Sequence, residues 1–237
     1  MKKMKEPWTT HILTLFPEMF PGPLSFSIIG KALKEKNWSL NLIDLKNFSK
    51  KGVKHIDDKP YGGGSGMIIK GEIIHEALKK LKKKIKSNYS IVYLTPKGKK
   101  LDQKVVKKLS KKKNLILVCG KYEGIDQRVI DIWGMEEISV GDYILSGGEI
   151  AAMSLVDSCV RLLPNVLGSK ESLKSETFEN NLLEYPQYTK PMKWLGKNVP
   201  KVLLSGNHEK IKNWKEKESF RITKIKRPDL LRKVAKK

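Results

Sequence analysis

Residues 91–98 read Ile-Val-Tyr-Leu-Thr-Pro-Lys-Gly, an apolar run that passes directly into a glycine-containing loop. The same succession occurs at 115–124 and at 136–149, where strand-like runs lead into Gly-Lys-Tyr-Glu-Gly and Gly-Asp-Tyr-Ile-Leu-Ser-Gly-Gly-Glu. Open α/β sheets bind ligands at the carboxyl ends of their parallel strands, and glycine lets a backbone approach a ligand closely. A single loop of this kind is unremarkable because glycine ends many strands, but three in succession predict one shared pocket built mostly from backbone.

Strands and helices alternate on both sides of these loops. Continuous apolar runs are expected of central parallel strands, and apolar residues at helical spacing indicate helices. Strands that alternate with helices form βαβ units, so the expected fold is α/β with a mostly parallel sheet. We predict strands at 11–15, 40–45, 91–94, 115–118 and 136–140, and helices at 27–36, 73–85, 102–109, 126–133 and 149–163.

The character of the sequence changes after Leu163. The next twenty residues are polar, turn-rich and without periodicity, which is typical of a linker or mobile loop. Beyond Pro200 the pattern is helical with a basic outer face, and the expected core residues are Ile211, Trp214, Phe220 and Ile222. We therefore expect an α/β domain at 1–163, a flexible interdomain linker at 164–185 and a small basic helical domain at 186–237.

Composition narrows the class of protein. The chain has 237 residues, of which 39% are hydrophobic, enough for a proper core. No apolar stretch approaches the roughly 20 residues of a membrane span, and no signal peptide is recognisable; we expect a cytoplasmic protein. The two cysteines, Cys119 and Cys159, lie in apolar contexts, which favours buried free thiols over a disulfide.

The net charge of +23 is carried by two segments. Residues 79–113 contain fifteen lysines and one acid, and residues 201–237 contain thirteen lysines and arginines and four acids. Such an excess favours a polyanionic partner, with RNA or DNA the obvious candidates. The alternative is that these lysines are simply the solvated faces of surface helices.

Other residues with chemical potential have ordinary alternatives. The glycine cluster at 60–67 could cradle a phosphate or be only a flexible turn; it lacks the Gly-Lys-Ser/Thr ending of a P-loop. Arg161 ends an apolar helical segment and needs an anionic or hydrogen-bonding partner if it is buried. The four histidines show no metal-ligand spacing and are expected to be structural.

Six stretches, taken together, resemble the bacterial tRNA (guanine-N1)-methyltransferases of the TrmD type. They occur in order over nearly the whole chain: PYGGGSGM at 60–67, YLTPKGKKLDQ at 93–103, CGKYEGIDQRV at 119–129, EISVGDYILSGGE at 137–149, LLEYPQYTKP at 182–191 and VLLSGNHE at 202–209. The resemblance implies an enzyme of the SPOUT knotted methyltransferase class, in which the three loops form a deep trefoil knot. It also implies a homodimer whose active sites are shared between subunits.

In such enzymes the cofactor S-adenosyl-L-methionine sits bent in the knot. The resemblance therefore places the cofactor against residues of all three loops: Tyr93, Leu94, Thr95, Pro96, Gly120, Tyr122, Glu123, Gly124, Val140, Gly141, Asp142, Tyr143, Ile144, Leu145, Gly147 and Gly148. Charged side chains are scarce in these loops, which is consistent with an adenine ring read by backbone groups.

The resemblance also names the reaction: methylation of N1 of the guanosine 3′-adjacent to the anticodon, position 37 of tRNA. Neutral guanosine N1 carries a proton, so a general base must remove it while a cation stabilises charge on O6. The matching residues are Glu176, where the family has aspartate, and Arg161. The basic carboxyl-terminal segment is expected to grip the anticodon stem-loop. A divalent ion, Mg²⁺, is also implied, although no ligand cluster is visible in the sequence.

Two other functions are compatible with parts of the sequence. A non-catalytic RNA-binding protein with a vestigial ligand fold would share the charge, but the loops, Arg161 and a carboxylate at 176 favour the enzyme. A nucleotide hydrolase would need a phosphate-binding lysine motif, which the sequence lacks.

Overall fold

The computed structural model describes residues 7–49, 55–85, 88–167, 177–178 and 181–232. The chain divides into two compact units, residues 1–168 and 169–237, and each is described by itself. Among the described residues, no helix is both long and apolar enough to cross a membrane.

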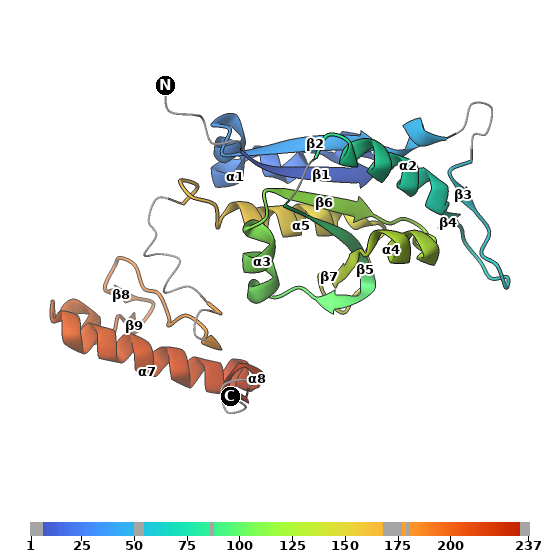
Figure 1. Ribbon diagram of the computed structural model, residues 1–237. Coiled ribbons are helices and arrows are strands. Elements are labelled where there is room, and N and C mark those ends of the chain that lie inside the picture. Colours follow the sequence, from blue (N-terminus) through green and yellow to red (C-terminus); the bar gives the residue numbers. More distant parts are fainter. Residues whose placement is uncertain (1–6, 50–54, 86–87, 168–176, 179–180, 233–237) are drawn as a thin grey trace, which may run out of the picture. The chain divides into compact units, whose positions relative to one another are not determined.

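The first unit is built on a five-stranded sheet with the order β2-β1-β6-β5-β7, in which every neighbouring pair is parallel (Figure 1). The α/β class with a mostly parallel sheet is therefore confirmed. The strands are β1 (Trp8–Thr14), β2 (Trp38–Asp44), β5 (Tyr89–Lys100), β6 (Asn114–Cys119) and β7 (Glu136–Ser139). A separate two-stranded hairpin pairs β3 (Asp57–Asp58) with β4 (Ile68–Ile69).

Helices connect these strands close to the predicted positions. They are α1 (Ser27–Lys34), α2 (Gly71–Lys82), α3 (Gln103–Ser110), α4 (Gln127–Trp133) and α5 (Gly148–Val160), with short 3-10 helices η1 (Pro17–Met19), η2 (Gly22–Ser25) and η3 (Leu45–Phe48).

Side-chain capping fixes where two of these helices begin. The Asp102 carboxylate accepts a hydrogen bond from the Val105 amide at 2.9 Å at the start of α3, and the Asp126 carboxylate accepts one from the Arg128 amide at 2.9 Å at the start of α4. Helix α4 then ends at Gly134, which has the left-handed conformation typical of helix ends.

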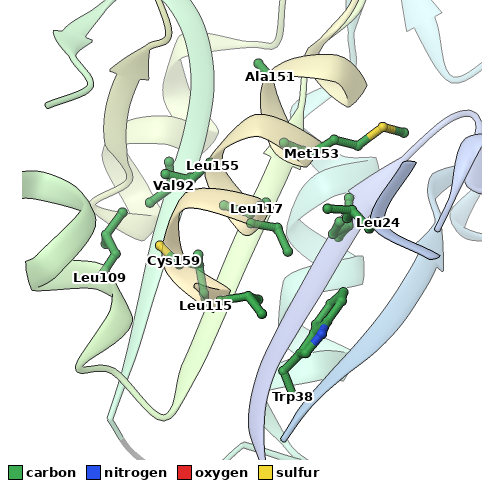
Figure 2. Packing of buried hydrophobic residues seen from close by; sticks show 14 of the residues in the cluster. Leu24, Trp38, Val92, Leu109, Leu115, Leu117, Ala151, Met153, Leu155 and Cys159 are labelled. Atoms are coloured by element: carbon green, nitrogen blue, oxygen red, sulfur yellow. The ribbon is translucent and has the colours of Figure 1, made fainter. Parts of the chain in front are cut away.

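Two apolar clusters cover the two faces of the sheet. On one face, α1, α3 and α5 pack against the central strands, and α5 carries Ala151, Leu155 and Cys159 toward Val92 of β5 and Leu117 of β6 (Figure 2). On the other face, α2 and α4 pack against the opposite side chains of the same strands. Because both faces are covered, the central strands are apolar throughout, which explains the continuous runs in the sequence.

The second unit centres on α7 (His208–Lys226), which Asn207 caps by accepting a hydrogen bond from the Lys210 amide at 3.0 Å. Trp214 lies against Tyr185 and Tyr188, with ring centroids 6.3 and 6.4 Å from its own. The other elements of this unit are β8 (Lys193–Trp194), β9 (Lys197–Asn198), η5 (Lys201–Leu204) and α8 (Pro228–Arg232).

The prediction that Phe220 belongs to the core of this unit is wrong. Phe220 is 53% exposed, whereas Ser219 and Thr223 of the same helix are buried and Ile211, Trp214 and Ile222 are half-buried. The Thr223 hydroxyl accepts a hydrogen bond from the Leu183 amide at 2.8 Å, so the face turned inward is held partly by polar contacts. Apolar spacing alone did not indicate that face.

Both cysteines are buried free thiols, as the sequence predicts. Burial and the nearby Glu149 carboxylate raise the pKa of the Cys119 thiol well above its ordinary value, and burial raises that of Cys159 to about 12. A thiol must be deprotonated and accessible to react.

We therefore predict that neither thiol reacts with a thiol-specific alkylating reagent at pH 8 in the native protein, whereas both react once it is denatured. Mass spectrometry of the alkylated protein measures the number of labels. Rapid labelling of either cysteine under native conditions would contradict this packing.

Candidate functional site

The parallel register brings the three predicted loops together at the carboxyl ends of the strands. Strand β5 pairs with β6 on one side and with β7 on the other, so the chain leaves all three strands at the same end of the sheet. A cavity of about 510 Å³ lies between these loops, within the size range of small-molecule sites. Every residue that the sequence assigned to the cofactor lines this cavity except Asp142, which is exposed and lies 3.5 Å from Lys100.

The second loop packs against the buried side chain of Tyr93. Burial raises the pKa of its phenol, while hydrogen bonds with the Thr95 side chain and the Ile125 backbone act in the opposite direction. A Cβ at Gly120 or Gly124 would lie within 2.9 Å of the Tyr93 ring or hydroxyl, and Gly124 also has a φ of +117°. Glycine is therefore required where this loop passes over the tyrosine.

The third loop returns to the second across a very short distance. The Gly148 amide donates a hydrogen bond to the Gly120 carbonyl at 2.9 Å, and a Cβ at Gly148 would lie 2.7 Å from the Cα of Cys119. Lys121 and Gly147 form an isolated antiparallel bridge, and the Lys121 ammonium donates to the Ser146 carbonyl at 2.6 Å. These contacts join the second and third loops into one wall of the cavity.

A buried carboxylate anchors the helix that follows. Glu149, in the first turn of α5, is 3% exposed and accepts a hydrogen bond from the Thr14 hydroxyl at 2.6 Å. Thr14 is the last residue of β1 and is itself fully buried. The carboxylate gains further stabilisation from the amino-terminal end of the helix dipole. This contact connects the end of the first strand to the beginning of α5, directly after the cavity-lining glycines.

The third loop begins with a turn held by Ser139. Its hydroxyl donates to the Gly141 carbonyl at 2.9 Å and lies 3.2 Å from the amide of the same glycine, which donates to it. Tyr143 follows and is 57% exposed at the cavity, with its ring directly over Gly141. An aromatic ring in this position can contact a planar ligand while remaining free to move.

The glycine cluster at 60–67 lies beside this cavity without lining it. The Glu123 amide donates to the Met67 carbonyl at 3.0 Å, and a Cβ at Gly66 would meet the Glu123 side chain. Strand β4 continues the contact, because the Ile69 amide donates to the Gly124 carbonyl at 3.0 Å. The cluster therefore packs against the second loop and leaves Glu123 as the carboxylate on the cavity wall.

Sequence reasoning missed several residues of the wall. They share a position next to the predicted ones: Lys97, Lys121, Ile138, Ser139, Ser146 and Ala151. The two lysines were overlooked because the loops were read as poor in charge. Since Lys97 and Lys121 fall inside the loop sequences themselves, those motifs were the signal that could have identified them.

Arg161, one of the two residues assigned to catalysis, does not line this cavity in its own chain. Arg161 directly follows α5, whose thirteen residues begin at the cavity with Gly148. Ala151 of the same helix also lines the cavity, and the ten residue steps from there to Arg161, at about 1.5 Å per residue, span roughly 15 Å. Glu176 lies outside the described residues, so its position stays a prediction.

A larger and more open depression of about 1070 Å³ lies between the β3–β4 hairpin, α2 and α4. Four of its charged groups form two ion pairs: Lys70 lies 3.3 Å from Asp58, and Arg128 lies 2.6 Å from Asp126. Lys59 and Glu72 also line the depression. Nowhere in the described parts of the chain do three His, Cys, Asp or Glu side chains gather so that they could hold a metal ion.

The fold and this cavity define an α/β protein with a ligand site formed by three loops at the carboxyl edge of its parallel sheet. Residues 8–233 match the family described as tRNA (Guanine-1)-methyltransferase TrmD, and the chain belongs to that family. The resemblance found in the six motifs is thereby confirmed.

Curated relatives are similar over almost their full lengths. The tRNA (guanine-N(1)-)-methyltransferase of Ehrlichia canis is 52% identical over 221 residues, which cover 93% of this chain and 94% of that protein. The proteins of the same name from Pelagibacter ubique and Rhodospirillum rubrum are each 50% identical; the alignments cover 97% and 92% of this chain and 99% and 90% of those proteins.

Two alanine substitutions should separate ligand binding from folding. At Gly141 a new Cβ would meet the exposed Tyr143 ring, which can move, so Gly141→Ala should weaken ligand binding with little change in stability. At Gly148 the new Cβ would meet backbone, which cannot move, so Gly148→Ala should lower stability by about 1–3 kcal/mol. Chemical denaturation and calorimetric titration with S-adenosyl-L-methionine measure the two effects; equal loss of stability in both variants would contradict this account.

Proposed function

We propose that this chain transfers a methyl group from S-adenosyl-L-methionine to N1 of guanosine 37, 3′-adjacent to the anticodon of tRNA. The observation that carries the proposal is the family match over residues 8–233, together with a cavity formed by the loops that the same resemblance assigns to the cofactor. The relatives named above carry the corresponding enzyme name over almost the whole chain.

The cavity suits the proposed cofactor in size and in the chemistry of its wall. Loop glycines leave space that side chains would fill, and backbone amides and carbonyls of the three loops can read an adenine edge. Glu123 adds a carboxylate, and Tyr122 and Tyr143 add rings. The sulfonium group of S-adenosyl-L-methionine supplies a methyl group that is already electrophilic.

The protein residues then have to make guanosine N1 nucleophilic. We assign Glu176 as the general base that takes the N1 proton, because a neutral N1 has no lone pair available for attack. Arg161 is assigned to O6, where negative charge develops as the proton leaves. Glu176 is one methylene longer than the family aspartate, which changes the reach of the base and preserves its chemistry.

A homodimer with shared active sites explains the distance between Arg161 and the cavity. If one chain supplies the loops and its partner supplies Arg161, a residue roughly 15 Å from the cavity along its own α5 can still serve the reaction. Exposed apolar residues near α1 and α5 in the first unit, Phe26, Ile28 and Ile150, support such an association.

The proposal includes a trefoil knot formed by the three loops. Helix α5 starts between the second loop and the end of β1, since Gly148 contacts Gly120 and Glu149 contacts Thr14. Strand β7, which precedes it in the chain, lies at the sheet edge next to β5. A chain that returns from that edge to the centre beneath the preceding loops is the path expected of the knotted class.

The remaining parts of the proposal concern partners and location. The basic segment that includes α7 would bind the anticodon stem-loop through phosphate contacts. Mg²⁺ is included as the ion that the resemblance implies, and no ligand is assigned to it because the described residues form no such cluster. We place the activity in the cytoplasm, where tRNA is modified.

Methyl transfer from labelled S-adenosyl-L-methionine tests the activity directly. A tRNA transcript with guanosine at position 37 should be labelled, and the same transcript with adenosine there should not, because adenine lacks the N1 proton and the O6 that the site is built to meet. Equal labelling of the two transcripts would overturn the proposal.

The variant Glu176→Gln provides the matched protein control. It retains the size of the side chain but cannot accept the proton, so labelling should slow by at least about a hundredfold. S-adenosyl-L-methionine should still raise its melting temperature as it does for the unchanged protein.

Mixing two inactive variants tests the shared site. Arg161→Ala removes the partner of O6, and Gly141→Trp fills the cavity, so each homodimer should be inactive. In a mixed dimer both changes fall in one site and leave the other intact, so refolding an equal mixture should restore about one quarter of the unchanged activity. Absence of restored activity, with mixed dimers verified by mass spectrometry, would place Arg161 and the cavity in the same chain.

A further inference from the structure

A second concentration of positive charge lies on the first unit, away from the cavity. Four lysines form it, and we call it the lysine edge: Lys83 and Lys84 follow α2, and Lys111 and Lys112 follow α3. The connections that carry them are adjacent, because the Lys113 and Asn114 amides both donate to the Asn88 carbonyl, at 3.1 and 3.2 Å. Three of the four side chains are exposed and Lys112 is half-exposed.

The charge of the lysine edge is not balanced within the described residues. Two lysines on these helices have carboxylate partners: Lys79 lies 3.3 Å from Glu76, and Lys108 lies 2.9 Å from Glu136. No described carboxylate lies within ion-pair distance of the four edge lysines. The one acid in 79–113, Asp102, caps α3 at its opposite end. Like charges gathered without partners repel each other, and a polyanion would relieve that repulsion.

The lysine edge and the cavity lie at opposite ends of the parallel strands. Both connections enter the amino-terminal ends of β5 and β6, where Tyr89 is in register with Asn114 (Figure 1). The cavity begins at the other end of the same pairing, where Leu94 is in register with Cys119. Five residue steps of about 3.3 Å separate these two levels by roughly 17 Å. The lysine edge therefore does not line the cavity of its own chain.

We propose that the lysine edge binds phosphates of the tRNA outside its anticodon stem-loop. The inference rests on the proposed function, which assigns the anticodon stem-loop to the cavity and to the basic segment that includes α7, so the phosphates left for these lysines are those of the rest of the tRNA. Lysine ammonium groups bind phosphates as point charges without reading bases. The surface therefore adds affinity for the whole tRNA and no sequence preference.

The test uses the full chain with all four lysines changed to glutamine, and a matched variant with all four changed to arginine. Both variants are measured against full-length tRNA and against an isolated anticodon stem-loop over a series of salt concentrations. For full-length tRNA, the glutamine variant should bind about a thousandfold more weakly at 0.1 M salt, and its plot of log K against log salt should be shallower by about 3. The arginine variant should bind like the unchanged protein, and stem-loop binding should be equal for all three.

Three results would overturn the inference: unchanged tRNA binding by the glutamine variant, an equal loss on tRNA and stem-loop, or a loss that arginine does not restore. Melting temperatures of the variants show whether the fold is intact, and a glutamine variant that fails to fold is replaced by the two pairs, Lys83/Lys84 and Lys111/Lys112, each changed alone. Failure of the proposed function is distinguishable, because it would abolish methylation of both RNAs by the unchanged protein, whereas the binding measurements require no turnover.

Discussion

The loop cavity depends on the close backbone contact between Gly148 and the end of β6. A Cβ at this position would overlap Cys119, and the hydrogen bond to the Gly120 carbonyl holds the third loop against the second. Without that approach, the third loop would have no fixed position relative to the strands that carry the other two. The cavity, the start of α5 and the Glu149–Thr14 contact all follow from this one close approach of two segments.

Much of the first unit was predictable because its forces are local or periodic. Buried parallel strands require continuous apolar runs, and the helices begin at recognisable caps such as Asp102. Glycine loops after three such strands also indicated a shared cavity. The lysines on its wall were missed because spacing gives no sign of a side chain folded back onto a neighbouring loop, as Lys121 is onto Ser146. Phe220 was misplaced because a short amphipathic pattern does not show which face of α7 is buried by polar contacts.

Because Arg161 lies away from the cavity of its own chain, the proposed chemistry requires two chains at each active site. Helix α5 begins at the cavity and is followed by Arg161, so in the proposed dimer its length sets the distance between the two sites that one chain serves. The motifs that carry the family resemblance include the loops that line the cavity. The lysine edge lies at the amino-terminal ends of the same strands.

The Glu149–Thr14 hydrogen bond joins residues 135 positions apart in the chain. During synthesis, most of the first unit must therefore leave the ribosome before the Thr14 hydroxyl at the end of β1 can bind Glu149. A contact of such long sequence separation forms late, since the intervening chain must first be ordered. A nascent chain that ends before residue 149 lacks both this contact and part of the cavity wall, so the cavity is completed only as α5 is synthesised.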